Sequence, residues 1–504
     1  MSKENTNLDR VRRILGKLEQ AQVRQLSCYG SDSHHFRLKP PLSESDLQAF
    51  ETEHQIRLPE DYRAFLLHAG NGGAGPYNGL FPLDEWNDFA DWVEDERPDN
   101  FLALPCPLYI GMPRTPDWEE HFSNVSPYQG TLSLNSRGCA YATQLIVSGP
   151  YSGRVVYVDA DANEPPYIVH EPDFLSWYER WLDELLQGYE GGWFGYGPGG
   201  GEEDFLRILD DPQADEDFKT EAAIAFCRLP RLSDDAAQRM PSFLDSSLAG
   251  VRLGALATIG KFELKAFSEN AAQLLEDPSA DVRQRAIFTI INLDPLRWIE
   301  AIRRRLQEDS DENVKHTAFF RLQGAGALTQ NELLHLVNES PRSKLRGVAA
   351  AEIGRVTQDV PLLIRLLTDE DDQVRLNALL GLRRLQARTA LPQILEMLSR
   401  ERVSHIIDRT LEMLTELREP STAPILLEWA NSTDDFHRLN SIKALAQIGD
   451  ERATPIAQAM LQEERQAFRK TPPGGSMSTT DTISELVRKS LQESPNLTLR
   501  QLAL

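Results

Sequence analysis

The sequence predicts an α+β domain, with helices packed on an antiparallel sheet, followed by an all-α solenoid. Its 504 residues are too many for one compact core. The segment 187–201 contains eight glycines and one proline, a composition that suits neither a helix nor a strand. Beyond that segment, one helical pattern recurs every 29 to 33 residues. We therefore expect a first domain at 1–187, a glycine-rich linker at 188–201 and a solenoid at 202–504.

The first domain shows both helix and strand patterns. One helix should begin near Ser43, and a second should start at Pro59 and end at Gly70, because these residue types suit helix ends. Apolar segments separated by glycine turns predict strands, and an aromatic-rich segment predicts a closing helix. The expected strands are 130–135, 140–148 and 154–159, and the closing helix is 172–186.

The linker carries three aromatic residues among its glycines: Trp193, Phe194 and Tyr196. They either dock on a neighbouring domain or belong to a flexible connection. The sequence favours neither alternative.

The second part repeats one helical signature. A large apolar residue is followed by a small residue four positions on and by another large residue eight positions on. These offsets place the three side chains on one stripe of a helix, where the small residue lets a neighbouring helix approach closely. Another apolar helix precedes each copy, so one unit is a helical hairpin that must stack on others to bury its faces. The copies start at Phe218, Val251, Val282, Val314, Leu345, Val374, Ile406 and His437.

The pattern weakens after about residue 460. The composition of 470–481 predicts a flexible insert, and 483–491 predicts a last helix that caps the open end of the stack.

The repeats resemble the HEAT family in its short bacterial form over residues 202–460. Asp-Pro and Val-Arg pairs carry this resemblance: Asp211-Pro212, Asp277-Pro278, Val251-Arg252, Val282-Arg283 and Val374-Arg375. The resemblance implies a solenoid of the kind that mostly binds other macromolecules.

A basic residue follows the first large residue in seven of the eight copies. These cations form either a surface strip that grips an anion or an internal ladder of ion pairs between neighbouring repeats. Acidic residues in the turn just before each cation favour the ladder. The cations are Lys219, Arg252, Arg283, Lys315, Arg346, Arg375 and Arg438.

The first domain resembles the SUKH family, also called the Smi/Knr family, over residues 35–187. The first matching block is Leu58-Pro59, Asp61-Tyr62, Phe65-Leu66 and Asn71-Gly72-Gly73, continuing as 75–81. The second block is Gly138-Cys139, Leu145 to Val147, Gly149, Gly153 and Val155, followed by Phe174, Trp177 and Trp181.

This resemblance implies binding without catalysis. Many such domains act in bacterial polymorphic toxin systems as immunity proteins that bind and neutralise a partner toxin, and others serve as scaffolds. The leading hypothesis is a cytoplasmic immunity protein that occludes a toxin domain, which we expect to be a basic nuclease-type toxin. The alternative is a scaffold or adaptor protein whose solenoid is its main binding surface.

Residues 84–120 form the strongest local anomaly, with eleven acidic residues against two basic ones and several aromatic residues between them. Clustered carboxylates raise the association rate with a basic partner, and aromatic anchors carry affinity. The alternative without a binding role is a solvated acidic helix whose aromatic face packs on the core. The candidate partner-binding residues are Asp84, Glu85, Trp86, Asp88, Asp91, Trp92, Glu94, Asp95, Glu96 and Trp118.

Charge and motif content exclude other classes of function. A net charge of −24 opposes binding to nucleic acid or anionic membrane, and hence a HEAT-type DNA glycosylase. The four cysteines are widely spaced and predict neither disulfides nor a zinc site. No catalytic, cofactor-binding or metal-binding motif is present, and neither a membrane span nor a secretory signal is visible. We expect a cytoplasmic protein that is not an enzyme and whose partner is another protein, in an oligomeric state that the sequence leaves open.

Overall fold

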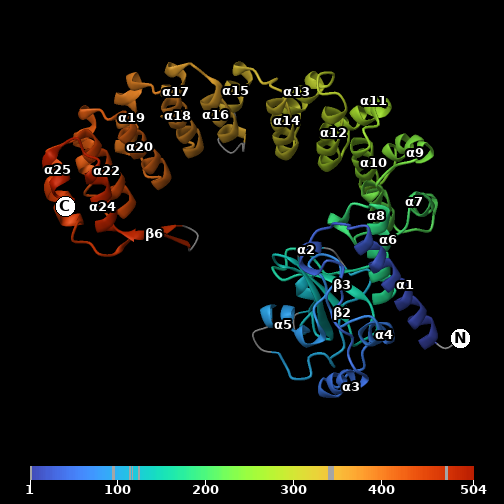
Figure 1. The fold of residues 1–504 in the computed structure, drawn as a ribbon. Helices are drawn as coiled ribbons and strands as arrows, with labels where there is room; N and C mark the ends of the chain where they lie inside the picture. The colour runs from blue at the N-terminus through green and yellow to red at the C-terminus, as the bar shows by residue number, and fades with distance from the viewer. Residues whose placement is uncertain are drawn as a thin grey trace. The chain divides into compact units, whose positions relative to one another are not determined.

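A computed structural model describes residues 3–93, 97–112, 115, 117–122, 125–338, 345–471 and 475–504. The chain forms two compact units, Met1–Trp298 and Ile299–Leu504. The first unit holds the α+β domain together with three helical repeats, and the second holds further repeats (Figure 1). This confirms the predicted fold class of an α+β domain followed by a helical solenoid. The domain limits of 1–187, 188–201 and 202–504 stay a prediction.

The α+β domain is built on a four-stranded antiparallel sheet in the order β1-β2-β3-β4. The strands are β1 (Thr131–Gly138), β2 (Tyr141–Ile146), β3 (Val155–Asp159) and β4 (Tyr167–Ile168). The first three are the predicted strands, and Gly138 lies in a left-handed conformation at the turn between β1 and β2, with a φ angle of 96°. The strand β4 was not predicted, because its two residues are too few to show a periodic pattern.

Helices complete this domain. The segments before the sheet are α1 (Lys3–Val23), α2 (Ser31–His34), α3 (Glu44–Glu53), α4 (Glu60–His68), η1 (Leu83–Glu85), α5 (Asp88–Val93) and η2 (Trp118–Phe122). The closing helix α6 (Phe174–Gln187) follows the sheet. As predicted, the Ser43 side chain caps α3 by accepting a hydrogen bond from the backbone N–H of Asp46.

The core of the domain is aromatic. The ring of Phe174 on α6 lies 4.8 Å from that of Tyr62 and 5.1 Å from that of Phe65, both on α4. The indole N–H of Trp177 donates to the hydroxyl of Tyr157 on β3 over 3.0 Å, which ties α6 to the sheet. Aromatic residues of α4 and α6 therefore form a large part of the domain core.

Each repeat is a pair of helices, and the second helix of each pair carries the predicted signature. In the first unit the segments are α7 (Glu202–Asp210), α8 (Glu216–Ala225), η4 (Phe226–Arg228), α9 (Asp234–Leu244), α10 (Ala249–Lys261), η5 (Lys265–Phe267), α11 (Ser268–Gln273), η6 (Leu274–Glu276) and α12 (Ala280–Leu293). The small residue of the signature is buried, as at Ala222, Ala255 and Ala286.

The second unit continues the same pairing. Its helices are α13 (Ile299–Glu308), α14 (Glu312–Gly324), α15 (Gln330–Val337), α16 (Leu345–Val356), α17 (Val360–Leu366), α18 (Asp372–Arg384), η7 (Arg388–Ala390), α19 (Leu391–Arg400), α20 (Ser404–Leu417), η8 (Pro420–Thr422), α21 (Ala423–Trp429), α22 (Asp435–Ile448), η9 (Glu451–Ala453), α23 (Thr454–Met460), α24 (Ile483–Gln492) and α25 (Leu497–Gln501). Figure 1 shows the signature helices α14, α16, α18 and α20 in one row.

The regular spacing of the cations produces an internal ladder. Arg252 pairs with Asp277 over 2.7 Å, and Arg375 pairs with Glu401 over 2.9 Å, each acid preceding the next signature helix. Arg346 and Arg438 pair with Asp369 and Glu463 in the same way. Because Arg252, Arg283 and Arg346 are each less than 10% exposed, they do not form an exposed strip, and the structure supports the ladder.

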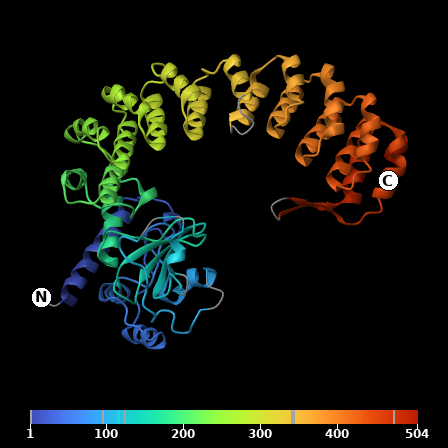
Figure 2. The same ribbon diagram turned by 180° about the vertical axis from the view of Figure 1, so that it is seen from behind.

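The insert near residue 470 is a β-hairpin, so the prediction of a flexible segment was wrong. Strands β5 (Gln466–Thr471) and β6 (Gly475–Thr482) pair antiparallel (Figure 2). Arg469 on β5 binds Asp408 and Asp434, each over 2.6 Å, and thereby fixes the hairpin to α20 and to the start of α22. The composition of the segment concealed these long-range ion pairs.

Asp61 gives the α+β domain a predicted pH response. Its carboxylate accepts a hydrogen bond from the backbone N–H of Leu175 over 3.0 Å, but burial raises its pKa to about 6. The folded state therefore binds a proton between pH 4 and 6 that the unfolded state does not, and this contribution to stability is lost as the pH rises. Relative to the wild type, Asp61→Asn should gain stability from pH 4 to pH 7 by up to about 3 kcal/mol.

Thermal unfolding followed by tryptophan fluorescence at several pH values measures this difference. Glu60→Gln is the control, because Glu60 is exposed beside Asp61. A stability difference for Asp61→Asn that does not change with pH would contradict the assignment.

Candidate functional site

The acidic segment is held against the sheet with its carboxylates outward. The side chains of Asp84, Glu85, Asp88 and Asp91 are exposed. Between them Phe89 is 2% exposed, and its ring lies 5.0 Å from that of Tyr128. Backbone contacts to Ser133 on β1 fix the segment: its hydroxyl accepts from Phe89 over 3.0 Å, and its N–H donates to the carbonyl of Trp86 over 2.8 Å.

Three of these carboxylates have no ion-pair partner among the residues that the structure describes. Asp91 pairs with Arg97 and also accepts a hydrogen bond from Asn87. Asp84, Glu85 and Asp88 form no such pair, so their charge is available to an incoming cation.

The aromatic members of the predicted site occupy different environments. Trp86 is half-buried, with the Arg97 guanidinium 5.0 Å from its ring and the His54 ring at 4.9 Å. Trp118 is fully buried, and its indole N–H donates to the carbonyl of Ala162 over 3.3 Å. The prediction that Trp118 lies on the partner-binding surface was therefore wrong. The acids on either side of it, Asp117 and Glu119, indicate a surface, but its own ring fills the core.

Part of the predicted site lies outside the described residues. Glu94, Asp95 and Glu96 belong to this part of the chain, and the side chain of Trp92 is likewise not described. The described candidate site is thus formed by Asp84, Glu85, Trp86, Asp88 and Asp91.

A chain of buried charges joins α6 to the first repeat. Arg180 binds Glu171 over 2.6 Å and Glu184 over 2.8 Å, and the second oxygen of Glu184 binds Arg228 at the end of η4. These four side chains, which we call the buried charge chain, are each at most 10% exposed. Burial lowers the pKa of Arg228, and the negative charge of Glu184 opposes that shift.

The glycine-rich segment docks on the domain. Phe194 is 3% exposed, and its carbonyl accepts hydrogen bonds from the hydroxyls of Tyr77 and Tyr157 over 3.0 and 3.1 Å. Gly195, with a φ angle of 83°, passes so close to Tyr157 that an added Cβ would lie 1.8 Å from its hydroxyl oxygen. Of the two alternatives for this segment, the structure supports docking over a flexible connection.

Arg137 fixes the next part of the same segment. Its guanidinium lies 4.1 Å from the ring centre of Tyr157 and 5.0 Å from that of Tyr196, and it donates to the Tyr196 hydroxyl over 3.1 Å. Arg180 then donates to the carbonyls of Gly197 and Pro198. We call the glycine-rich segment, residues 188–201, the strap. It packs where the α+β domain meets the first repeat.

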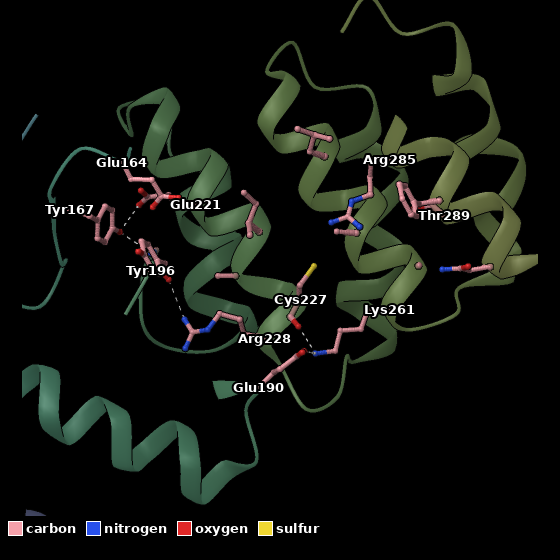
Figure 3. A pocket seen from close by; sticks show the side chains of 18 of the residues that line it. Glu164, Tyr167, Glu190, Tyr196, Glu221, Cys227, Arg228, Lys261, Arg285 and Thr289 are labelled. Carbon is pink, nitrogen blue, oxygen red and sulfur yellow. Dashed lines mark hydrogen bonds and ion pairs between the residues drawn. The ribbon is translucent and has the colours of Figure 1, made fainter. Parts of the chain in front are cut away.

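A groove of about 960 Å³ opens beside this strap, entirely within the first unit (Figure 3). Its walls come from β4 and the segment before it, from the strap, from η4 and from the signature helices α8, α10 and α12. Ile224, Leu253 and Phe288 supply apolar surface, and Ile224 is 47% exposed. We call this feature the junction groove.

Sequence reasoning missed the junction groove because its lining comes from five separate stretches of the chain. The repeats do contain a pattern that could have indicated an exposed apolar surface. The residue six positions after the first large residue is apolar in the first six copies, although the buried stripe lies at offsets zero, four and eight. These residues are Ile224, Ala257, Phe288, Phe320, Ala351 and Leu380.

The described residues provide neither a group of metal ligands nor a membrane-spanning helix. In the described part of the chain, no three histidine, cysteine or carboxylate side chains are grouped to hold a metal ion. Among the same residues, no helix has the length and apolarity needed to cross a membrane.

Family models match both parts of the chain. Residues 41–122 match the SMI1/KNR4 family (SUKH-1), residues 360–388 match a HEAT repeat, and residues 406–471 match HEAT repeats. No curated protein is similar enough in sequence to be counted as a relative. The chain thus combines a SUKH-1 domain with HEAT repeats, which confirms the resemblance drawn from its motifs, and both kinds of module indicate protein–protein interaction.

Three solved structures that resemble this chain have low sequence identity to it. An engineered protein is 12% identical and covers 60% of this chain and 97% of its own, with a TM-score of 0.34. The YibA protein of Escherichia coli is 16% identical and covers 58% and 92%, with a TM-score of 0.29. Human deoxyhypusine hydroxylase, in complex with glycerol, is 18% identical and covers 48% and 95%, with a TM-score of 0.21.

The buried charge chain makes a prediction for stability. Arg228→Met leaves one oxygen of the buried Glu184 without its cation, so the first unit should lose about 3 kcal/mol of its free energy of unfolding. Urea denaturation followed by tryptophan fluorescence measures the loss. Arg239→Met is the matched control, because its ion pair with Asp210 is solvent-exposed and should contribute less than about 1 kcal/mol. Equal losses in the two variants would show that the buried charges do not hold the joint.

Proposed function

We propose that this protein is a cytoplasmic immunity protein of a bacterial toxin system, which binds a basic toxin domain and occludes its working surface. The observation that supports this most directly is the row of exposed carboxylates at Asp84, Glu85 and Asp88, which lies within the segment that matches the SUKH-1 family. The resemblance to SUKH domains is the reason for proposing a toxin as the partner. Binding alone accounts for the proposed function, and no catalytic step is required.

The chemistry of the acidic segment suits a nuclease-type toxin. Such a toxin is basic where it contacts phosphate, so unpaired carboxylates attract the same surface and raise the rate of encounter. Trp86 stands beside these acids with part of its ring exposed, and aromatic side chains contribute strongly to the affinity of an interface. The acids thus steer the partner, and occupation of its basic surface neutralises it.

A second candidate function is that of a scaffold or adaptor whose HEAT repeats are the main binding surface. The observation that favours it is the apolar residue six positions after the start of the first six signatures. Within the second unit, this residue is 42% exposed at Phe320 and 38% exposed at Leu380. Exposed apolar side chains repeated at one position indicate a surface that another protein covers.

Charge reversal of the acidic segment tests the leading proposal. The variant carries Asp84→Lys, Glu85→Lys, Asp88→Lys and Asp91→Lys. Co-expression with the toxin domain encoded beside this gene should restore growth for the wild type and fail to do so for the variant. At low salt, the association rate measured by surface plasmon resonance should fall at least about tenfold, because electrostatic steering is lost.

The control reverses four exposed acids elsewhere: Glu19, Glu53, Glu263 and Glu428. It changes the net charge equally and should retain rescue and most of the association rate. If the wild type does not bind or neutralise the toxin domain, the immunity function is wrong. If both variants behave like the wild type, the acidic segment is not the binding surface.

A further inference from the structure

The junction groove has an apolar floor built from three consecutive repeats. Ile224 on α8, Leu253 on α10 and Phe288 on α12 all line it, and none of the three belongs to the buried stripe of its helix. Ile224 exposes 47% of its surface. Contact between this apolar surface and water is unfavourable, and a partner that covers it would remove that cost. The floor therefore suits apolar side chains from a partner.

The two ends of the groove carry opposite charges. Figure 3 shows Glu164 and Glu221 at the end where the α+β domain meets α8, and Arg285 at the end formed by α12. Glu221 pairs with His170, whereas Glu164 and Arg285 are exposed and form no ion pair with any residue that the structure describes. A complementary occupant must be basic at the first end and acidic at the second.

This charge pattern selects among possible occupants. Nucleic acid and anionic lipid carry one sign of charge along their length and are repelled by a chain with a net charge of −24. A peptide segment can present a basic residue, apolar side chains and an acidic residue in order along its length. One face of an amphipathic helix does so at positions i, i+3 or i+4, and i+7.

The groove is also held in shape before a partner arrives. Its walls meet at the strap and at Arg228, a member of the buried charge chain. Lys261 at the end of α10 binds Glu190 of the strap over 3.0 Å, which fixes a further part of the wall. A site that needs no rearrangement loses less affinity to ordering on binding.

We propose that the junction groove binds an amphipathic segment of a partner protein, with apolar side chains on Ile224, Leu253 and Phe288, a basic residue toward Glu164 and an acidic residue toward Arg285. This site is separate from the acidic segment, and it requires only that the partner be a protein. It makes the first unit a receptor for a short peptide motif.

Selection from a random 16-residue peptide library displayed on phage, with the full chain as bait, tests this proposal. The enriched peptides should carry apolar residues at helical spacing between a basic and an acidic end. Fluorescence anisotropy with a labelled copy of the most enriched peptide then measures affinity. Ile224→Asp should weaken binding at least about tenfold, because it places a charge on the apolar floor. Leu296→Asp is the matched control, since Leu296 is 84% exposed outside the groove, and it should bind like the wild type.

A charge exchange tests the predicted orientation. Arg285→Glu should lower the affinity for the peptide about tenfold. Replacing the acidic residue of the peptide by lysine should restore binding to this variant but not to the wild type. Lys265→Glu, at an exposed lysine that does not line the groove, should have no effect. Circular dichroism of each variant checks that it is folded, and Ile224→Ser gives a milder change if Ile224→Asp is not.

Three outcomes would overturn the proposal: no enriched peptide family, binding that Ile224→Asp and Ile224→Ser leave intact, or equal loss in the two control variants. The fourfold lysine variant of the acidic segment should bind the peptide normally. Failure at the acidic segment and failure at the groove are therefore distinguishable.

Discussion

The structure depends on the buried charge chain formed by Glu171, Arg180, Glu184 and Arg228. Three of these residues follow the sheet of the α+β domain, and Arg228 ends the first signature segment, so the network crosses from one kind of module to the other. Buried ion pairs add little to stability compared with apolar packing, but removing one partner costs about 3 to 5 kcal/mol. The value of this network is therefore geometric. It permits one arrangement of the two modules in which every charge is paired, and the strap fills the remaining space with Phe194 and Tyr196.

This arrangement places the two proposed binding surfaces on one compact unit. The acidic segment lies on the α+β domain, where β1 and the buried Phe89 hold its carboxylates outward. The junction groove exists only because the domain and three repeats meet, since both contribute to its lining. The two surfaces differ in chemistry: one offers unpaired negative charge, and the other offers an apolar floor between opposite charges. A partner that contacts both would be selected first by long-range charge and then by the shape and side chains of one segment.

The sequence was sufficient for features that depend on local periodicity. Helix ends at Ser43 and Pro59, three strands and the repeat signature all follow from spacing within a few residues, and the structure contains them. Features that depend on contacts between distant residues could not be predicted. The hairpin near residue 470 is held by Arg469 on Asp408 and Asp434, some 61 and 35 residues away. Trp118 sits among surface acids in sequence but in the core in space, and the groove draws on five stretches whose proximity only the joint creates.

The buried charge chain and the strap should make the α+β domain and the first three repeats one rigid body. Double electron–electron resonance between spin labels on unnatural amino acids at Glu53 and Gln273, both exposed, measures this directly. We expect a single distance distribution in the wild-type protein, as narrow as that of a control pair placed within the α+β domain at Glu53 and Asn163. Arg228→Met should broaden the distribution between Glu53 and Gln273. A broad or multiple distribution in the wild-type protein would contradict a rigid body.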